Sequence, residues 1–348
     1  MLATNHAQTF FDMTAKLAKT VLKRIGGIVA FPVAKRLAMR SPRILMYHRF
    51  GPKGLDIKIF EAQVKILKSS FNVISLSKLS MSLQQGIPLP AHTVVITVDD
   101  GYADFYTHAY PVLKKYSMPV TFYIVSEFVD RNIWLWPDTI AFVLKNTSHV
   151  DYTVRLGGMA RNFRMGNSLE RRQTWNDIAD YCLTLRNKEK HRFIREVASD
   201  LGVIVPAAPV EEYAAVSWAD ILEMKKYGVE VGSHTCTHPK LTMLDQDELE
   251  YELRDSKKRI EEMADTSAES FCYPNGTRAD YDDDIKRMVQ RSGYANATVG
   301  FFDSRVTDDM FALRRYSIDL DMFHFRKVIN SAEYLQCSIR EKDWYLLR

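Results

Sequence analysis

Residues 93–102 read Thr-Val-Val-Ile-Thr-Val-Asp-Asp-Gly-Tyr. The apolar and β-branched start of this stretch predicts a strand that is buried on both faces, as in a parallel sheet. Helical patterns occur between runs of this kind, for example at residues 60–67 and 244–263. Strands that alternate with helices indicate a mainly parallel α/β sheet or barrel. Further strands are predicted at residues 43–47, 120–125, 229–232, 270–273 and 295–299.

The composition is that of an ordinary globular protein, with 46% hydrophobic and 26% charged residues in a chain of 348. A chain of this length can form one large domain or two smaller ones. Basic residues exceed acidic ones by only four (47 minus 43), so charge gives no argument for nucleic acid as a partner. The four cysteines include no CxxC pair, so neither a disulfide framework nor a Cys-rich zinc site is predicted. A cytoplasmic location is expected, with export as the alternative.

The first 40 residues differ in character from the rest. No acidic residue occurs between Asp12 and Asp56, whereas ten lysines and arginines do. Residues 10–25 have helical periodicity, which predicts a basic amphipathic helix suited to peripheral contact with an anionic membrane. A helix packed on the domain, or a transit peptide, is compatible with the same pattern. The apolar face of this helix would carry Phe10, Met13, Leu17, Val21 and Ile25.

A long connection interrupts the strand and helix alternation at about residues 134–213. Its charged, helical runs predict a helical insertion within one domain that spans residues 41–330. Residues 331–348 are expected to be a C-terminal tail. Trp134 and Trp136 open the insertion, and their rings either stack on a sugar or belong to the core.

Asp99, Asp100 and Gly101 stand where the strand predicted from residue 93 onward ends. Adjacent side chains on a strand point to opposite faces, but a glycine turn lets both carboxylates reach one pocket. Two neighbouring carboxylates need a cation close by, or one of them takes up a proton. The alternative is a solvent-exposed turn, because Asp-Gly is a common turn dipeptide.

Two more segments follow predicted strands. His234 and His238 are four residues apart, and in a helical turn both imidazoles would face one metal. Alternatively, they are unrelated surface histidines. Residues 271–276 read Phe-Cys-Tyr-Pro-Asn-Gly and predict a turn whose backbone N–H groups can line an oxyanion hole.

Asp-Asp-Gly, then His-x-x-x-His-Pro, then Tyr-Pro-x-Gly, in this order, resembles the NodB-type polysaccharide deacetylases of carbohydrate esterase family 4. The resemblance covers about residues 43–318, with the insertion as its least typical part. It implies an irregular (β/α) barrel that hydrolyses an N-acetyl group from an amino sugar in a polysaccharide or lipid-linked glycan. Alternatives are a deformylase or cyclic amidase on the same fold, or a non-catalytic carbohydrate-binding relative. A phosphate-ester hydrolase would need more metal ligands than these segments supply.

The resemblance also assigns roles to residues. It implies that Asp100, His234 and His238 bind a divalent metal, for which zinc is the first candidate. Asp99 would be the general base that takes a proton from the attacking water. The backbone N–H of Tyr273 would help to stabilise the oxyanion.

Two departures from the family pattern remain. The third family motif usually begins with an arginine that orients the base, but Cys272 stands at that position. Arg314 or Arg315 is expected to supply the cation instead, and Arg314 is taken as the candidate. An alternative is that both arginines are surface charges.

The second departure concerns the general acid. The family's C-terminal Leu-x-x-His motif is absent, and the surroundings of His324 do not fit it. His48 follows the first predicted strand, and some branches of the family carry the acid on an N-terminal Tyr-His. His48 is therefore expected to be the general acid, with a structural histidine at a strand end as the alternative.

Overall fold

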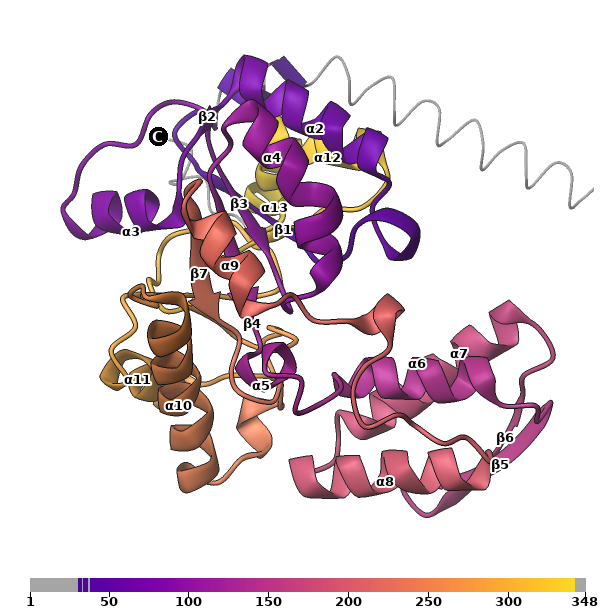
Figure 1. Cartoon of the computed structure of the whole chain (residues 1–348). Helices are drawn as coiled ribbons and strands as arrows, with labels where there is room; N and C mark the ends of the chain where they lie inside the picture. The colour runs from indigo at the N-terminus through magenta and orange to yellow at the C-terminus, as the bar shows by residue number, and fades with distance from the viewer. Residues whose placement is uncertain (1–30, 33, 37, 342–348) are drawn as a thin grey trace, which may run out of the picture.

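The computed structural model describes residues 31–341 except residues 33 and 37 (Figure 1). Its centre is a parallel sheet of eight strands in the order β10-β1-β3-β4-β7-β8-β9, with β2 paired to β3. The strands are β1 (Arg43–Tyr47), β2 (Asn72–Val73), β3 (Thr93–Val98), β4 (Val120–Ile124), β7 (Val229–Ser233), β8 (Ser270–Cys272), β9 (Asn296–Thr298) and β10 (Tyr316–Ser317).

Every residue of β1, β3 and β4 is buried, as their continuous apolar sequences predict. Helices cover the outer face of the sheet, so the strands have protein on both sides (Figure 1). The chain thus adopts the predicted (β/α) barrel. The helices around it are α2 (Ile57–Ser70), α3 (Leu76–Gln84), α4 (Tyr110–Tyr116), α5 (Ser126–Val129), α9 (Trp218–Lys225), α10 (Gln246–Ala264), α11 (Asp283–Arg291), α12 (Met322–Ile329) and α13 (Ala332–Glu341).

Residues 313–317 connect the two ends of the sheet. Leu313 forms a bridge to Thr298 of β9, and its N–H donates to the carbonyl of Ala297 at 2.8 Å. Three residues later, Tyr316 pairs with Leu45 of β1. One short segment therefore contacts both β9 and β1.

The insertion contains helices α6 (Trp136–Asn146), α7 (Ser168–Cys182) and α8 (Asn187–Asp200) and projects beside the barrel (Figure 1). It is not purely helical, because β5 (Asp151–Leu156) and β6 (Met159–Arg164) form an antiparallel hairpin. An apolar cluster of its own holds the insertion together. Trp134 and Trp136 are only 8% and 4% exposed, so both rings are part of the core.

The structure describes most of the expected C-terminal tail but not the expected N-terminal helix. Residues expected to be a tail form α13, which packs on α12. The expected amphipathic helix at residues 10–25 lies outside the described residues and stays a prediction. Within the part of the chain that the structure describes, no helix has the length and apolarity needed to cross a membrane.

Candidate active site

Asp99 and Asp100 lie at the carboxyl end of β3. The backbone turns sharply here, with φ of +80° at Asp100 and +94° at Gly101. Aspartate is one of the few residues other than glycine that adopt this left-handed conformation readily. The turn breaks the strand alternation, so Asp99 lies buried inside the barrel while Asp100 faces the loop that follows β7.

His234 and His238 converge on Asp100. Their Nε2 atoms lie 3.5 and 3.6 Å from the same oxygen, Oδ1, and their ring centroids are 4.8 Å apart. The expected helical turn does not bring them together. Thr235 and His238 have φ of +73° and +58°, so an irregular loop presents both rings. The prediction of a helical turn was therefore wrong, although the two histidines do face one point.

This group has the properties of a metal site. One ligand atom from each of Asp100, His234 and His238 lies within 4.8 Å of the others. His234 donates from Nδ1 to the carbonyl of Cys272 at 2.7 Å, which leaves its Nε2 free to bind a metal. Burial lowers the pKa of both imidazoles, that of His238 well below its usual value. Both rings are therefore neutral at neutral pH, as metal ligands must be.

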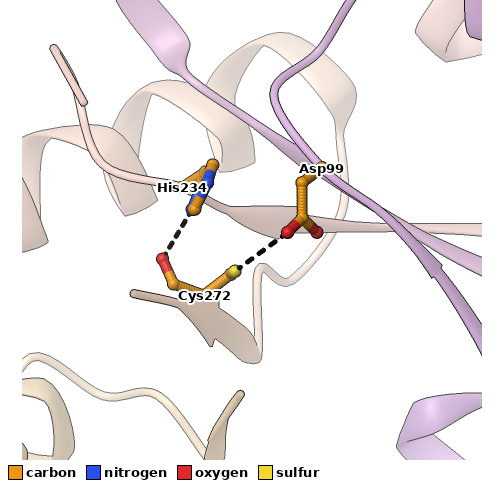
Figure 2. A group of neighbouring side chains, drawn as sticks. All are labelled: Asp99, His234 and Cys272. Carbon is orange, nitrogen blue, oxygen red and sulfur yellow. Dashed lines mark hydrogen bonds between the residues drawn. The ribbon is translucent and has the colours of Figure 1, made fainter. Parts of the chain in front are cut away.

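A second group of candidate ligands overlaps the first (Figure 2). It consists of Asp99, His234 and Cys272, and the Cys272 sulfur lies 3.6 Å from Asp99. Burial raises the pKa of the Cys272 thiol well above its usual value, so the sulfur carries its proton in the metal-free protein. Both oxygens of Asp99 are already bonded to an arginine. These contacts favour Asp100, His234 and His238 as the metal ligands.

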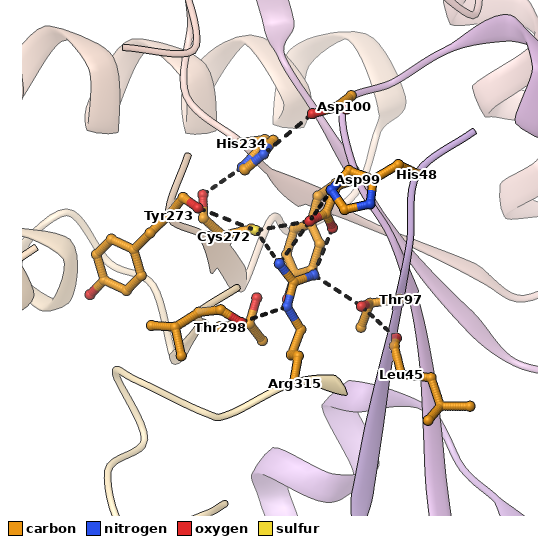
Figure 3. A network of polar contacts seen from close by, with 12 residues as sticks. Leu45, His48, Thr97, Asp99, Asp100, His234, Cys272, Tyr273, Thr298 and Arg315 are labelled. Carbon is orange, nitrogen blue, oxygen red and sulfur yellow. Dashed lines mark hydrogen bonds and ion pairs between the residues drawn. The ribbon is translucent and has the colours of Figure 1, made fainter. Parts of the chain in front are cut away.

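Arg315 is the cation that holds Asp99 (Figure 3). Its Nη1 and Nη2 donate to the two carboxylate oxygens, each at 2.7 Å. Burial alone would raise the pKa of Asp99, but the Arg315 guanidinium outweighs burial and holds that pKa below its usual range. Arg315 Nη2 also lies 3.0 Å from the sulfur of Cys272, the residue at the family's arginine position.

The choice of Arg314 as this cation is corrected by the structure. Arg314 Nε lies 3.2 Å from both carboxylate oxygens of Asp303, which is outside the Asp99 group. Neighbouring residues in an extended segment point to opposite sides, so only one of the two arginines can enter the barrel.

His48 lies beside Asp99 at the open side of the group (Figure 3). Its Nε2 is 3.8 Å from Asp99 Oδ2, and its side chain is 44% exposed. His324, by contrast, has Nδ1 3.6 Å from Asp319 and Nε2 3.4 Å from Glu333. The structure therefore places His48 next to Asp99 and gives His324 other partners.

The family model for polysaccharide deacetylases matches residues 86–297. The chain belongs to the polysaccharide deacetylase family. The YxkH protein of Bacillus subtilis (strain 168) is 23% identical over 285 residues, which cover 80% of this chain and 72% of YxkH. A poly-beta-1,6-N-acetyl-D-glucosamine N-deacetylase of Escherichia coli (strain K12) is 27% identical over 94 residues, or 25% of this chain and 14% of that protein.

Two solved structures share the fold of this deacetylase family member. The Streptococcus pyogenes deacetylase PplD, in complex with acetate, has a TM-score of 0.53 and 19% identity over 84% of this chain and 96% of PplD. IcaB from Ammonifex degensii has a TM-score of 0.55 and 17% identity over 83% of this chain and 97% of IcaB. At these identities the likeness concerns the fold alone.

The backbone N–H of Tyr273 is not available for its predicted role in oxyanion stabilisation. Its backbone N–H donates to the carbonyl of Thr298 at 3.2 Å and so continues the pairing of β8 with β9. Its ring stacks on Tyr281, and its hydroxyl donates to the carbonyl of Phe311 at 2.9 Å. The N–H expected to stabilise the oxyanion is already engaged in the sheet, which corrects that prediction.

Glu252 is a site residue that the motifs did not reveal. This α10 side chain is 4% exposed and accepts hydrogen bonds from the N–H groups of Cys236 and Thr237 at 2.8 and 2.9 Å. It thereby fixes the loop that carries both histidines. The available signal was a glutamate within the mostly apolar buried stripe of α10.

Lys190 is a second missed residue. It belongs to α8 of the insertion, is only 3% exposed, and has its Nζ 5.0 Å from the centroid of the Trp136 ring. Burial lowers the pKa of Lys190 to about 8, so the ammonium is still largely protonated at neutral pH.

The metal-ligand assignment predicts that His238→Ala loses bound zinc while the fold survives. Removal of one of three protein ligands leaves too few donors for a stable site. The measurement is the metal content of purified protein after dialysis against buffered zinc, with circular dichroism as the check on folding. His324→Ala is the matched control and should keep its zinc. Full zinc occupancy in His238→Ala would contradict the assignment.

Proposed function

We propose that this chain is a metal-dependent deacetylase that hydrolyses the N-acetyl group of an amino sugar in a polysaccharide or lipid-linked glycan. The observation that carries the proposal is the position of the buried carboxylate of Asp99. It lies between the cluster of Asp100, His234 and His238 and the exposed imidazole of His48. The name of the Escherichia coli relative, an N-deacetylase of poly-beta-1,6-N-acetyl-D-glucosamine, supports an N-acetylhexosamine as the substrate unit.

Asp100, His234 and His238 would hold the divalent cation, and two imidazoles with one carboxylate suit zinc. When bound there, the cation acts as a Lewis acid that polarises the acyl carbonyl and makes a water molecule more acidic. The hydrogen bond from His234 to the Cys272 carbonyl fixes the tautomer that this binding requires.

Asp99 is the proposed general base. Its lowered pKa keeps the carboxylate ionised across the neutral range, so it can accept the proton of the attacking water. Arg315 touches the carboxylate rather than the substrate, and we regard it as a positioning residue. The two parallel hydrogen bonds from its guanidinium fix the direction of both carboxylate oxygens.

His48 is the proposed general acid. The amine leaves as the tetrahedral intermediate collapses, and it needs a proton at that moment. An imidazole changes charge near neutral pH and can supply this proton. His48 directly follows β1, lies next to Asp99 and is partly exposed to solvent, so it can be reprotonated after each turnover.

Acetate release from N-acetylglucosamine oligomers and from lipid-linked amino sugars tests the proposed reaction. The zinc-loaded protein should release acetate, and Asp99→Asn should lower turnover by about 10²–10⁴ with metal retained, the range of a lost general base. Asp303→Asn is the matched control, because it also alters a buried carboxylate with an arginine partner. Near-normal turnover in Asp99→Asn would show that another group activates the water.

Arg315→Met should shift the acid limb of the kcat/KM profile to higher pH. Without the guanidinium, burial acts alone and raises the pKa of Asp99, so the base becomes protonated at a higher pH. Loss of one partner from a buried ion pair costs about 3–5 kcal/mol, so folding must be checked. Arg315→Lys keeps the charge and should shift the limb less, and Arg314→Met should leave it in place. An unchanged limb in folded Arg315→Met would refute the positioning role.

His48→Ala should retain zinc but lose most of its turnover, together with the alkaline limb of the pH–rate profile. That limb reflects loss of the proton that the leaving amine requires. His324→Ala should be almost silent, because its imidazole contacts Asp319 and Glu333. If the two variants behave the other way round, the C-terminal histidine is the acid.

A further inference from the structure

The insertion contacts the loop that carries the two metal-ligand histidines. The amide of Asn187, the first residue of α8, donates from Nδ2 to the hydroxyl of Thr237 at 3.5 Å. Lys190 lies one helical turn further along the same face, with its ammonium over the ring of Trp136. Thr237 directly precedes His238, so the start of α8 and the metal-ligand loop form one seam.

Several polar atoms of this seam are buried without a hydrogen-bond partner. They include Asn187 Oδ1, Trp136 Nε1 and His238 Nδ1. The Lys190 side chain is buried, yet no carboxylate oxygen of the described residues lies within 4.0 Å of its ammonium. Buried polar groups in native proteins are nearly always paired, so a group of unpaired ones requires an explanation.

Trp136 Nε1 can only donate, His238 Nδ1 donates when its Nε2 faces Asp100, and Asn187 Oδ1 can only accept. The Lys190 ammonium beside Trp136 adds further donors and a positive charge. No side chain caps the first turn of α8, so the positive end of that helix faces the same seam. Such a set of groups is complementary to negatively charged oxygen atoms.

The nearby carboxylate of Glu252 does not fill this role. It already accepts hydrogen bonds from the backbone of Cys236 and Thr237 and from the Thr237 hydroxyl. Its oxygens therefore hold the loop, and the Lys190 ammonium is left without an ion-pair partner in the described part of the chain.

We propose that the start of α8 and the metal-ligand loop form an oxyanion-binding subsite in which Lys190 pairs with a carboxylate or phosphate of the substrate. This proposal rests on the proposed deacetylase function and narrows its substrate class. The preferred glycan carries a negatively charged group close to the N-acetyl group that is hydrolysed. A carboxylate and a phosphate both present negatively charged oxygen atoms, and the experiments below distinguish between these two groups.

The kinetic test compares a neutral N-acetylglucosamine oligomer with matched oligomers that carry a phosphate or a carboxylate. The wild-type enzyme should have a higher kcat/KM for one charged oligomer than for the neutral one. Lys190→Met keeps the length of the side chain but removes its charge, and it should lower this ratio by about tenfold, mainly through KM. Lys188→Met is the matched control, since Lys188 lies on the same helix but is 90% exposed, and it should keep the ratio.

A binding test needs no turnover. Inorganic phosphate, titrated calorimetrically into metal-free protein, should bind wild type and Lys190→Arg, and bind Lys190→Met about tenfold more weakly. Equal phosphate affinity in wild type and Lys190→Met would overturn the subsite, as would a wild-type enzyme without preference for charged oligomers. A protein that binds phosphate through Lys190 but deacetylates none of the oligomers would instead overturn the proposed function.

Discussion

The paired hydrogen bonds between Arg315 and Asp99 are the interaction on which the rest of the site depends. Both side chains are almost completely buried, at 1% and 2% exposure. Charges removed from water in this way persist only when their partners satisfy them. Arg315 has further contacts with the Thr97 hydroxyl and the Val299 carbonyl, so its guanidinium is well satisfied. Arg315 lies in the segment that joins β9 to β1, so this pair both fixes the carboxylate of Asp99, the proposed base, and helps to connect the two ends of the sheet.

The proposed metal ligands are held by contacts among the protein's own groups. The Cys272 carbonyl orients His234, and Glu252 binds the backbone just before His238. These partners belong to the strand and helix that neighbour β7. The folded barrel therefore sets the positions of His234 and His238 by itself. Both imidazoles accordingly lie next to Asp100 in the structure.

Much of the fold could be predicted from sequence because buried parallel strands have continuous apolar sequences, as in β1, β3 and β4. The aspartates could be located because they directly follow β3, and the histidines because their segment begins directly after β7. The hairpin of β5 and β6 was missed, although Tyr152, Val154 and Leu156 alternate before a Gly-Gly turn. That pattern was a usable hairpin signal.

Other errors had physical causes that the sequence does not display. Arg314 and Arg315 differ only in which one faces inward, and the register of the two-residue strand β10 decides that. Tyr273 looked like an oxyanion donor because it opens a turn. Its N–H donates to Thr298 of β9 instead, because the pairing of β8 with β9 extends one residue further than the turn sequence indicates.

The position of His238 depends on two parts of the chain that the sequence separates widely. Glu252 of the barrel helix α10 holds Thr237 from one side, and Asn187 of the insertion contacts the same residue from the other. The hydrogen bond from Asn187 is long at 3.5 Å, whereas the bond to Glu252 is 2.9 Å, so the barrel supplies the firmer support. The insertion therefore adds groups next to a metal-ligand loop that the barrel already holds. The proposed oxyanion subsite at residues 187–190 can therefore vary in sequence without a change in Asp99 or in the cluster of Asp100, His234 and His238.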